Sequence, residues 1–182
     1  MRVRTSFFVT AWLVFVASLS GAQTFPKPVG RVNDFAGVID ADAAAAIDRR
    51  LDDLERATSH EIAVATVHSL DGMSVEDYAN KLFKSWGVGQ KKSNNGVLVL
   101  VAVDDHKMRI EVGYGLEGIL PDGLAGQVIR EEFTPRFKAG DYSGGIRQGV
   151  TRLADIVEKE HVLTPEELAA FNESSDADQA PV

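Results

Sequence analysis

Cysteine is absent from this chain of 182 residues, and histidine occurs only four times. The absence of cysteine excludes disulfides, thiolate metal sites, iron–sulfur clusters and a cysteine nucleophile. The shortage of histidine argues against a histidine-rich metal centre, and His60, His68 and His106 lack the spacing of metal ligands. No G-x-S-x-G motif is present, so no serine is marked as the nucleophile of a hydrolase.

Basic residues are also in short supply. The chain has 19 Lys and Arg against 27 Asp and Glu, for a formal net charge of −8. An acidic chain repels nucleic-acid phosphates, so we expect no nucleic-acid partner, whereas cations are favoured as ligands. Apolar residues make up 45% and charged residues 25%, which is typical of one globular domain.

One apolar run stands out near the start of the chain. Phe7 to Leu19 is preceded by Arg2 and Arg4 and followed by the small residues Ser20-Gly21-Ala22. This pattern predicts a signal peptide over residues 1–22. We therefore expect an exported protein, either periplasmic or secreted. No other run reaches the roughly 20 apolar residues of a spanning helix, so we expect no membrane span after cleavage.

The rest of the chain alternates strand and helix patterns. Strands are predicted over 61–67, 97–103 and 108–112, with the last two forming a hairpin, while 32–39 fits a short strand or an ordered loop. Helices are predicted over 41–57 after an Asp40 cap, from Ser74 to 86, from an Asp122 cap to just before Pro135, and over 142–160. This order indicates the α/β class: a three-layer α/β/α sandwich with a mixed sheet of about four strands.

The predicted domain covers residues 32–160. Residues 23–31 contain Pro26 and Pro28 and are predicted to form an extended lead-in. Residues 161–182 are predicted to hold a short helix over 165–171, with a Thr164 capping box, followed by a disordered acidic tail.

Gly113-Tyr-Gly-Leu-Glu-Gly118 matches G-x-G-x-x-G, the fingerprint of dinucleotide binding. The context differs from that of a nucleotide-binding fold. Pro121 delays the following helix, a second helix then replaces the required parallel strand, and Glu117 would repel a pyrophosphate. An oxidoreductase hypothesis rests on this motif alone.

Several acidic residues lie in or beside predicted loops. Asp34 precedes Gly37, Asp104 and Asp105 occupy a turn, and Glu117 and Asp122 flank the glycine-rich loop. Carboxylates held by such loops suit a hard cation such as Ca²⁺ or Mg²⁺. A second interpretation is open for three of them: a solvated turn for Asp104 and Asp105, and a helix cap for Asp122.

Four stretches together resemble the TPM domain family, which occurs in bacterial envelope proteins and in a plant thylakoid-lumen protein. They are Val32-Asn-Asp-Phe-Ala-Gly-Val38, Asn94-Asn-Gly-Val-Leu-Val-Leu-Val-Ala102, Arg109-Ile-Glu-Val-Gly-Tyr-Gly-Leu-Glu-Gly118 and Phe137-Lys-Ala-Gly-Asp-Tyr142. The resemblance implies an α/β/α sandwich, divalent-metal binding and, for the plant member, acid phosphatase activity.

The resemblance implies metal binding at acidic residues of these motifs and leaves open which of them are ligands. Asp34, Glu117 and Asp122 match acidic positions of the family's motifs, and Asp105, with Asp104 beside it, falls where the family often has an acid. Arg109 matches a family arginine and is a candidate to contact a phosphoryl oxygen; a strand-face ion pair is the alternative. Many bacterial members continue into a transmembrane helix and a glycine-rich tail, whereas this chain ends in an acidic one.

Two functions follow as hypotheses. The first is an exported module that binds a divalent cation, Ca²⁺ or Mg²⁺, and acts in interaction or assembly with an envelope protein partner. The alternative is a metal-dependent acid phosphatase that hydrolyses phosphomonoesters, with the cation polarising a water. The weak catalytic signature favours the first.

Overall fold

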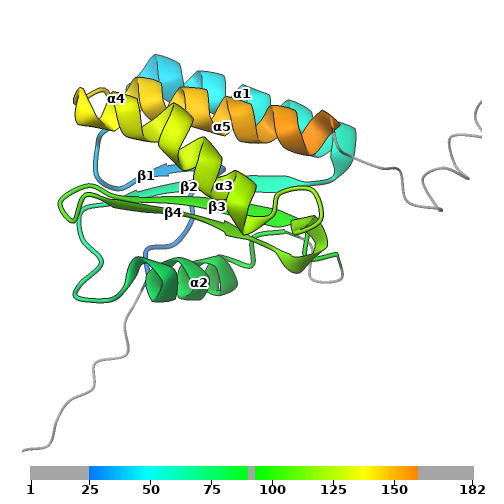
Figure 1. Cartoon of the computed structure of the whole chain (residues 1–182), viewed down its shortest axis with the longest axis horizontal. Coiled ribbons are helices and arrows are strands. Elements are labelled where there is room, and N and C mark those ends of the chain that lie inside the picture. The colour runs from blue at the N-terminus through cyan, green and yellow to red at the C-terminus, as the bar shows by residue number, and fades with distance from the viewer. Residues whose placement is uncertain (1–24, 90–92, 160–182) are drawn as a thin grey trace, which may run out of the picture.

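A computed structural model describes residues 25–89 and 93–159 (Figure 1). The predicted signal peptide, the predicted helix over 165–171 and the acidic tail lie outside these described residues. Residues 25–30 of the predicted lead-in form no helix or strand, and the Trp86 indole Nε1 donates a hydrogen bond of 2.8 Å to the Pro26 carbonyl.

A four-stranded sheet forms the middle layer, in the order β1-β2-β3-β4. The strands are β1 (Val32–Asp34), β2 (Glu61–Val67), β3 (Gly96–Ala102) and β4 (Lys107–Val112). β1, β2 and β3 are parallel, whereas β3 and β4 form the predicted antiparallel hairpin. The sheet is therefore mixed, as the sequence predicts, and 32–39 is a short strand followed by a loop.

Helices cover both faces of this sheet (Figure 1). They are α1 (Ala41–Thr58), α2 (Val75–Trp86), α3 (Asp122–Val128), α4 (Thr134–Lys138) and α5 (Tyr142–Lys159). Asp40 and Ser74 cap α1 and α2 as predicted, because their side chains accept hydrogen bonds from the Ala43 and Asp77 amides at 2.8 and 3.1 Å. Within the described residues, no helix has the length and hydropathy needed to cross a membrane.

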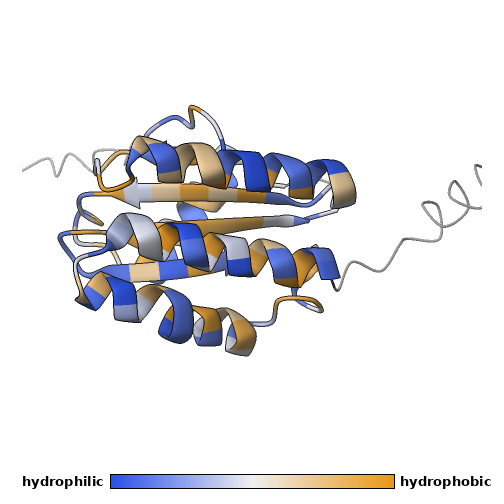
Figure 2. Ribbon diagram, turned by 90° about the horizontal axis from the view of Figure 1, so that it is seen from above, coloured by the Kyte–Doolittle hydropathy of each residue, from blue (hydrophilic) through white to orange (hydrophobic). Residues whose placement is uncertain are grey.

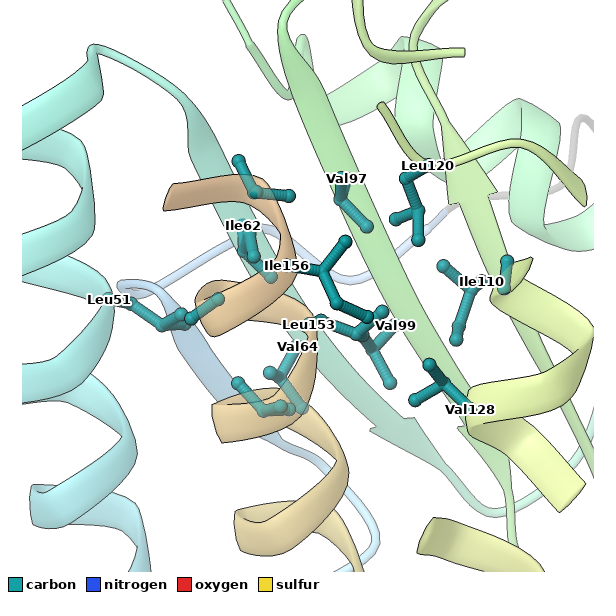
Figure 3. Close-up of a cluster of buried hydrophobic side chains, with 14 of the residues drawn as sticks. Leu51, Ile62, Val64, Val97, Val99, Ile110, Leu120, Val128, Leu153 and Ile156 are labelled. Atoms are coloured by element: carbon teal, nitrogen blue, oxygen red, sulfur yellow. The ribbon is translucent and has the colours of Figure 1, made fainter. Parts of the chain in front are cut away.

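Side-chain alternation along the strands divides the core in two. On one face of the sheet, Ile62, Val64 and Val99 point toward α1, α3 and α5. They belong to the larger cluster of buried side chains, which also contains Leu51, Leu153 and Val128 from those helices (Figure 3). Ala63, Ala65, Leu98 and Leu100 face α2 with the smaller cluster. β3 is buried at every position because helices cover both its faces. Figure 2 shows hydrophobic residues along the middle of the sheet, whereas the helices carry both hydrophobic and hydrophilic residues.

The order of the parallel strands carries an uncommon feature. The chain steps from β1 to β2 and from β2 to β3 in one direction across the sheet, yet α1 and α2 lie on opposite faces (Figure 1). The two crossovers therefore have opposite hands. One of them must be left-handed, which is rare for parallel strands.

Two predictions about the helices after β4 are wrong. Asp122 is the first residue of α3 rather than its cap, because Pro121 holds the extended cap conformation, with φ −66° and ψ 157°. The helix also does not end before Pro135. A π-helical segment, η2 (Ile129–Phe133), joins α3 to α4, and Pro135 lies in the first turn of α4. Pro135 lacks an N–H and is tolerated here because it lies in the first turn of α4, directly after the wider π-helical turn.

Candidate functional site

Asp34 ends β1 and closes the loop that follows it. One carboxylate oxygen, Oδ1, accepts hydrogen bonds from the Val38 amide at 3.0 Å and the Thr66 hydroxyl at 2.5 Å. The other, Oδ2, accepts from the Ile39 amide at 2.9 Å. A carboxylate offers about four acceptor positions, so three donors from the chain itself leave little capacity for a cation. Asp34 therefore has a structural role, which the sequence did not predict: its carboxylate holds the loop after β1.

Asp104 and Asp105 lie in the turn between β3 and β4, at the same end of the strands as Asp34. Asp105 Oδ2 accepts a hydrogen bond of 2.7 Å from the Leu70 amide, which ties this turn to the loop after β2. Asp104 Oδ2 lies 3.8 Å from His68 Nδ1, and both side chains are largely exposed. Asp105 is thus partly committed to the backbone, while Asp104 faces solvent.

The other predicted site residues meet beside β4. Arg109, Glu117 and Asp122 line a recess of about 330 Å³ together with Glu111 and the end of β4. The recess lies at the outer edge of the sheet, where the chain leaves β4 and enters α3. The structure therefore brings together three of the six predicted site residues.

Glu111 belongs to this recess although sequence reasoning did not select it. Its Oε2 accepts a hydrogen bond of 2.9 Å from Arg109 Nε, and its Oε1 accepts one of 2.8 Å from Asn80 Nδ2 of α2. Side chains alternate along a strand, so the sequence of β4 places Arg109 and Glu111 on one face. This pattern supports the strand-face ion pair left open for Arg109, and the structure contains that pair.

The glycine-rich motif serves the fold rather than a nucleotide. A Cβ on Gly113 would lie 2.2 Å from the Asn94 carbonyl oxygen, and one on Gly115 would lie 2.0 Å from the Ser93 carbonyl oxygen. The Gly115 amide donates to the Asn94 carbonyl at 3.1 Å. Both glycines are therefore required where the short helix η1 (Tyr114–Leu116) packs on the chain's own backbone.

The predicted acids do not form one cluster. Asp34, Asp104 and Asp105 lie where β1 and β3 end, whereas Glu117 and Asp122 follow the end of the antiparallel β4. At about 3.3 Å per residue, the length of β4 separates these two ends of the strands by roughly 15–20 Å. One cation therefore cannot reach both groups. Within residues 25–89 and 93–159, no three Asp, Glu or His side chains are grouped as a metal cage.

Within the recess, Glu117 and Asp122 are the carboxylates available for a ligand. Both are exposed, and neither has an ion-pair partner in the part of the chain that the structure describes. Two carboxylates beside a recess fit a cation that keeps most of its water, the usual mode for Mg²⁺, and they do not fit a dehydrated cage. The carboxylate of Asp122 also lies at the N-terminus of α3, where the helix dipole stabilises its charge.

Comparisons with solved structures place this architecture among known domains. The chain is similar to the N-terminal domain of a protein from P. gingivalis, with 35% identity, a TM-score of 0.67, and coverage of 71% of this chain and 83% of that one. It is also similar to the BA42 protein of Bizionia argentinensis, with 26% identity, a TM-score of 0.59, and coverage of 71% and 88%.

A third structure supports the fold alone. The N-terminal domain of cg2496 from Corynebacterium glutamicum is 18% identical, with a TM-score of 0.56 and coverage of 78% of this chain and 86% of that one. A search of curated proteins gives no match. The model of the TPM domain matches residues 32–156, which include the whole sheet and nearly all of α5. The chain therefore belongs to the TPM domain family.

Proposed function

We propose that this protein is an exported TPM-domain module which binds a divalent cation, Ca²⁺ or Mg²⁺, in the recess beside β4 and acts in interaction or assembly with an envelope protein. One observation carries the proposal: Glu117 and Asp122, two exposed carboxylates without a cationic partner among the described residues, line one recess. Glu111 adds a third carboxylate, but Arg109 and Asn80 occupy its oxygens.

The role of the cation in this proposal is to neutralise the recess. Glu117 follows η1 and Asp122 begins α3, so a shared ion would fix the segment between them against the edge of the sheet. β4 is an edge strand, and an ordered segment beside it forms part of the surface that a partner protein would meet. The predicted ligands Asp34, Asp104 and Asp105 lie at the other end of the strands, where β1 and β3 end, and are not part of this recess.

The experiment is an NMR titration of the metal-free protein with Ca²⁺ and, separately, Mg²⁺. Saturable amide shifts at Glu117, Asp122 and the residues between them, with small changes at Asp34 and Asp105, would support the recess. Shifts centred on Asp34 and Asp105 would place the site at the other end of the strands, where β1 and β3 end. Shifts spread over all exposed carboxylates, without saturation up to about 10 mM, would reject a site.

A metal-dependent acid phosphatase is the second candidate, because Arg109 lines the same recess as Glu117 and Asp122. When bound, a cation there would supply charge to offset a phosphomonoester. Arg109 would orient a phosphoryl oxygen through the guanidinium nitrogens that Glu111 does not use. Hydrolysis of phenyl phosphate that needs the cation and disappears in Arg109→Met would support this candidate. Turnover that persists in a Glu117→Gln, Asp122→Asn double variant would indicate a contaminating phosphatase.

A further inference from the structure

A second cavity, distinct from the recess beside β4, lies at the opposite end of that strand. It measures about 420 Å³ and is enclosed by the end of β3, the start of β4, the helix α4 and the start of α5. This volume falls within the roughly 300–1,000 Å³ of small-molecule sites. Ligands of α/β sheets collect outside the carboxyl ends of parallel strands, where this cavity opens.

The interior of the cavity is apolar. Val101 and Met108 come from the sheet, while Phe137 and Tyr142 come from the helices. The rings of Phe137 and Tyr142 stack, with centroids 4.8 Å apart and an interplanar angle of 30°. Phe137 and Tyr142 also bound the fourth motif that the sequence singled out, and neither of the functions considered above uses that motif. An aromatic or short alkyl group would bury its surface here in place of water.

The charge at the opening contrasts with that of the whole chain. The ionisable lining residues are His106, Lys107 and Lys138, together with the Tyr142 phenol, and no acidic side chain of residues 25–89 and 93–159 lines the cavity. Both lysines are exposed, and neither forms an ion pair with a described residue. In a chain of net charge −8, two unpaired lysines around one apolar cavity form a local site for an anion.

Two acidic residues that neighbour the lining residues in sequence, Asp105 and Asp141, are held by other partners, whereas Asp104 faces solvent beside His68. The Asp105 carboxylate binds the Leu70 amide at 2.7 Å, in the loop after β2. The Asp141 carboxylate binds Arg136 Nη1 at 2.9 Å and the Gly144 amide at 2.8 Å. These bonds hold the two carboxylates on groups outside the lining, so Lys107 and Lys138 are left to face a ligand.

We propose that this cavity binds small organic anions, with an aromatic or short alkyl body against Phe137 and Tyr142 and a carboxylate or phosphate group between Lys107 and Lys138. The inference goes beyond the proposed function, because it involves neither the recess nor a divalent cation. It requires both parts of the ligand: the apolar body fills the cavity, and the anionic group meets the two lysines.

The test is a set of NMR titrations in the presence of EDTA, which keeps the result independent of cation binding. The probes are 3-phenylpropionate, phenylphosphonate, 3-phenylpropan-1-ol and inorganic phosphate. We expect saturable amide shifts at Met108, Thr134 and Tyr142 with at least one organic anion, and binding about tenfold weaker or absent for the alcohol and inorganic phosphate. Binding of only the carboxylate or only the phosphonate would assign the natural ligand to that class.

A matched pair of variants controls for charge. Lys107→Gln with Lys138→Gln should weaken binding of the organic anion about tenfold. Lys81→Gln with Lys84→Gln removes the same charge from α2, on the other face of the sheet, and should change affinity less than about twofold. Equal binding of the alcohol, equal loss in both double variants, or no saturable shift with either organic anion up to about 10 mM would overturn the proposal.

Discussion

Arg109 and Glu111 pair along one face of β4, with Arg109 Nε 2.9 Å from Glu111 Oε2. The same carboxylate accepts from Asn80 of α2, so it joins the edge strand to the helix beneath the sheet. This pairing decides the charge of the recess. Glu111 is neutralised by its neighbour, and Glu117 and Asp122 remain as the carboxylates open to a cation.

Arg109→Met should tighten divalent-cation binding. The change removes a positive charge from the recess and releases one oxygen of Glu111, so the dissociation constant should fall by at least about threefold. Isothermal titration calorimetry measures it, with Arg152→Met on α5 as a control of equal charge. A weaker affinity in Arg109→Met alone would show that Arg109 supports the site rather than opposing it.

Asp34→Asn should destabilise the fold. The asparagine amide group cannot accept from the Ile39 amide and the Val38 amide as both carboxylate oxygens do. An unsatisfied, partly buried N–H costs about 1–3 kcal/mol. Urea denaturation followed by circular dichroism measures the loss, with the exposed Asp53→Asn as the control. An unchanged midpoint would mean that the loop after β1 does not depend on this carboxylate.

Ser143→Ala should raise the pKa of Asp40. That pKa lies below its usual value of 3.8 because the Ser143 hydroxyl, first, and the Ala43 amide bind the charged carboxylate. A depressed pKa adds stability above the unfolded value, and this stability is lost as the pH falls through the folded pKa. An NMR titration of the carboxyl carbon measures the change. Asp141, held by Gly144 and Arg136, is the internal control, and equal movement of both would contradict the assignment.

Two glycines on helices should respond in opposite directions to alanine. A Cβ on Gly149 would lie 2.1 Å from the Phe133 ring, so Gly149→Ala should cost about 1–3 kcal/mol through overpacking. A Cβ on Gly123 meets nothing within 4 Å. Gly123→Ala should therefore stabilise the fold by about 0.5 kcal/mol through helix propensity. Thermal unfolding of both variants tests the pair, and stabilisation by Gly149→Ala would show that Phe133 yields without cost.

Local signals predicted most of the fold. The Asp40 and Ser74 caps set the starts of α1 and α2, and the polar turn after β3 predicted the hairpin. These features depend on neighbours within a few residues, which sequence patterns record. The rule that proline ends a helix failed at Pro135, where a π-helical segment packed against α5 precedes the proline and leads into α4.

The candidate site was less predictable, because it depends on the end of the strands at which each loop lies. Asp34 lies at the end of β1 and Glu117 follows β4, and the antiparallel direction of β4 places them at opposite ends of the strands. The opposite hands of the two crossovers are also invisible in the sequence. The pairing of Glu111 with Arg109 could be predicted from strand alternation. Its hydrogen bond with Asn80 could not, because Asn80 is 31 residues away along the chain.

The most direct test of the cation proposal is calorimetric titration of metal-free protein with Ca²⁺ and Mg²⁺ in two double variants. Glu117→Gln with Asp122→Asn removes the two exposed carboxylates of the recess. Asp104→Asn with Asp105→Asn removes the same charge from the β3–β4 turn, at the other end of β4. We predict micromolar to millimolar binding that is lost in the first variant and kept in the second. Loss of binding in the second variant alone, or no binding by the unaltered protein, would contradict the account.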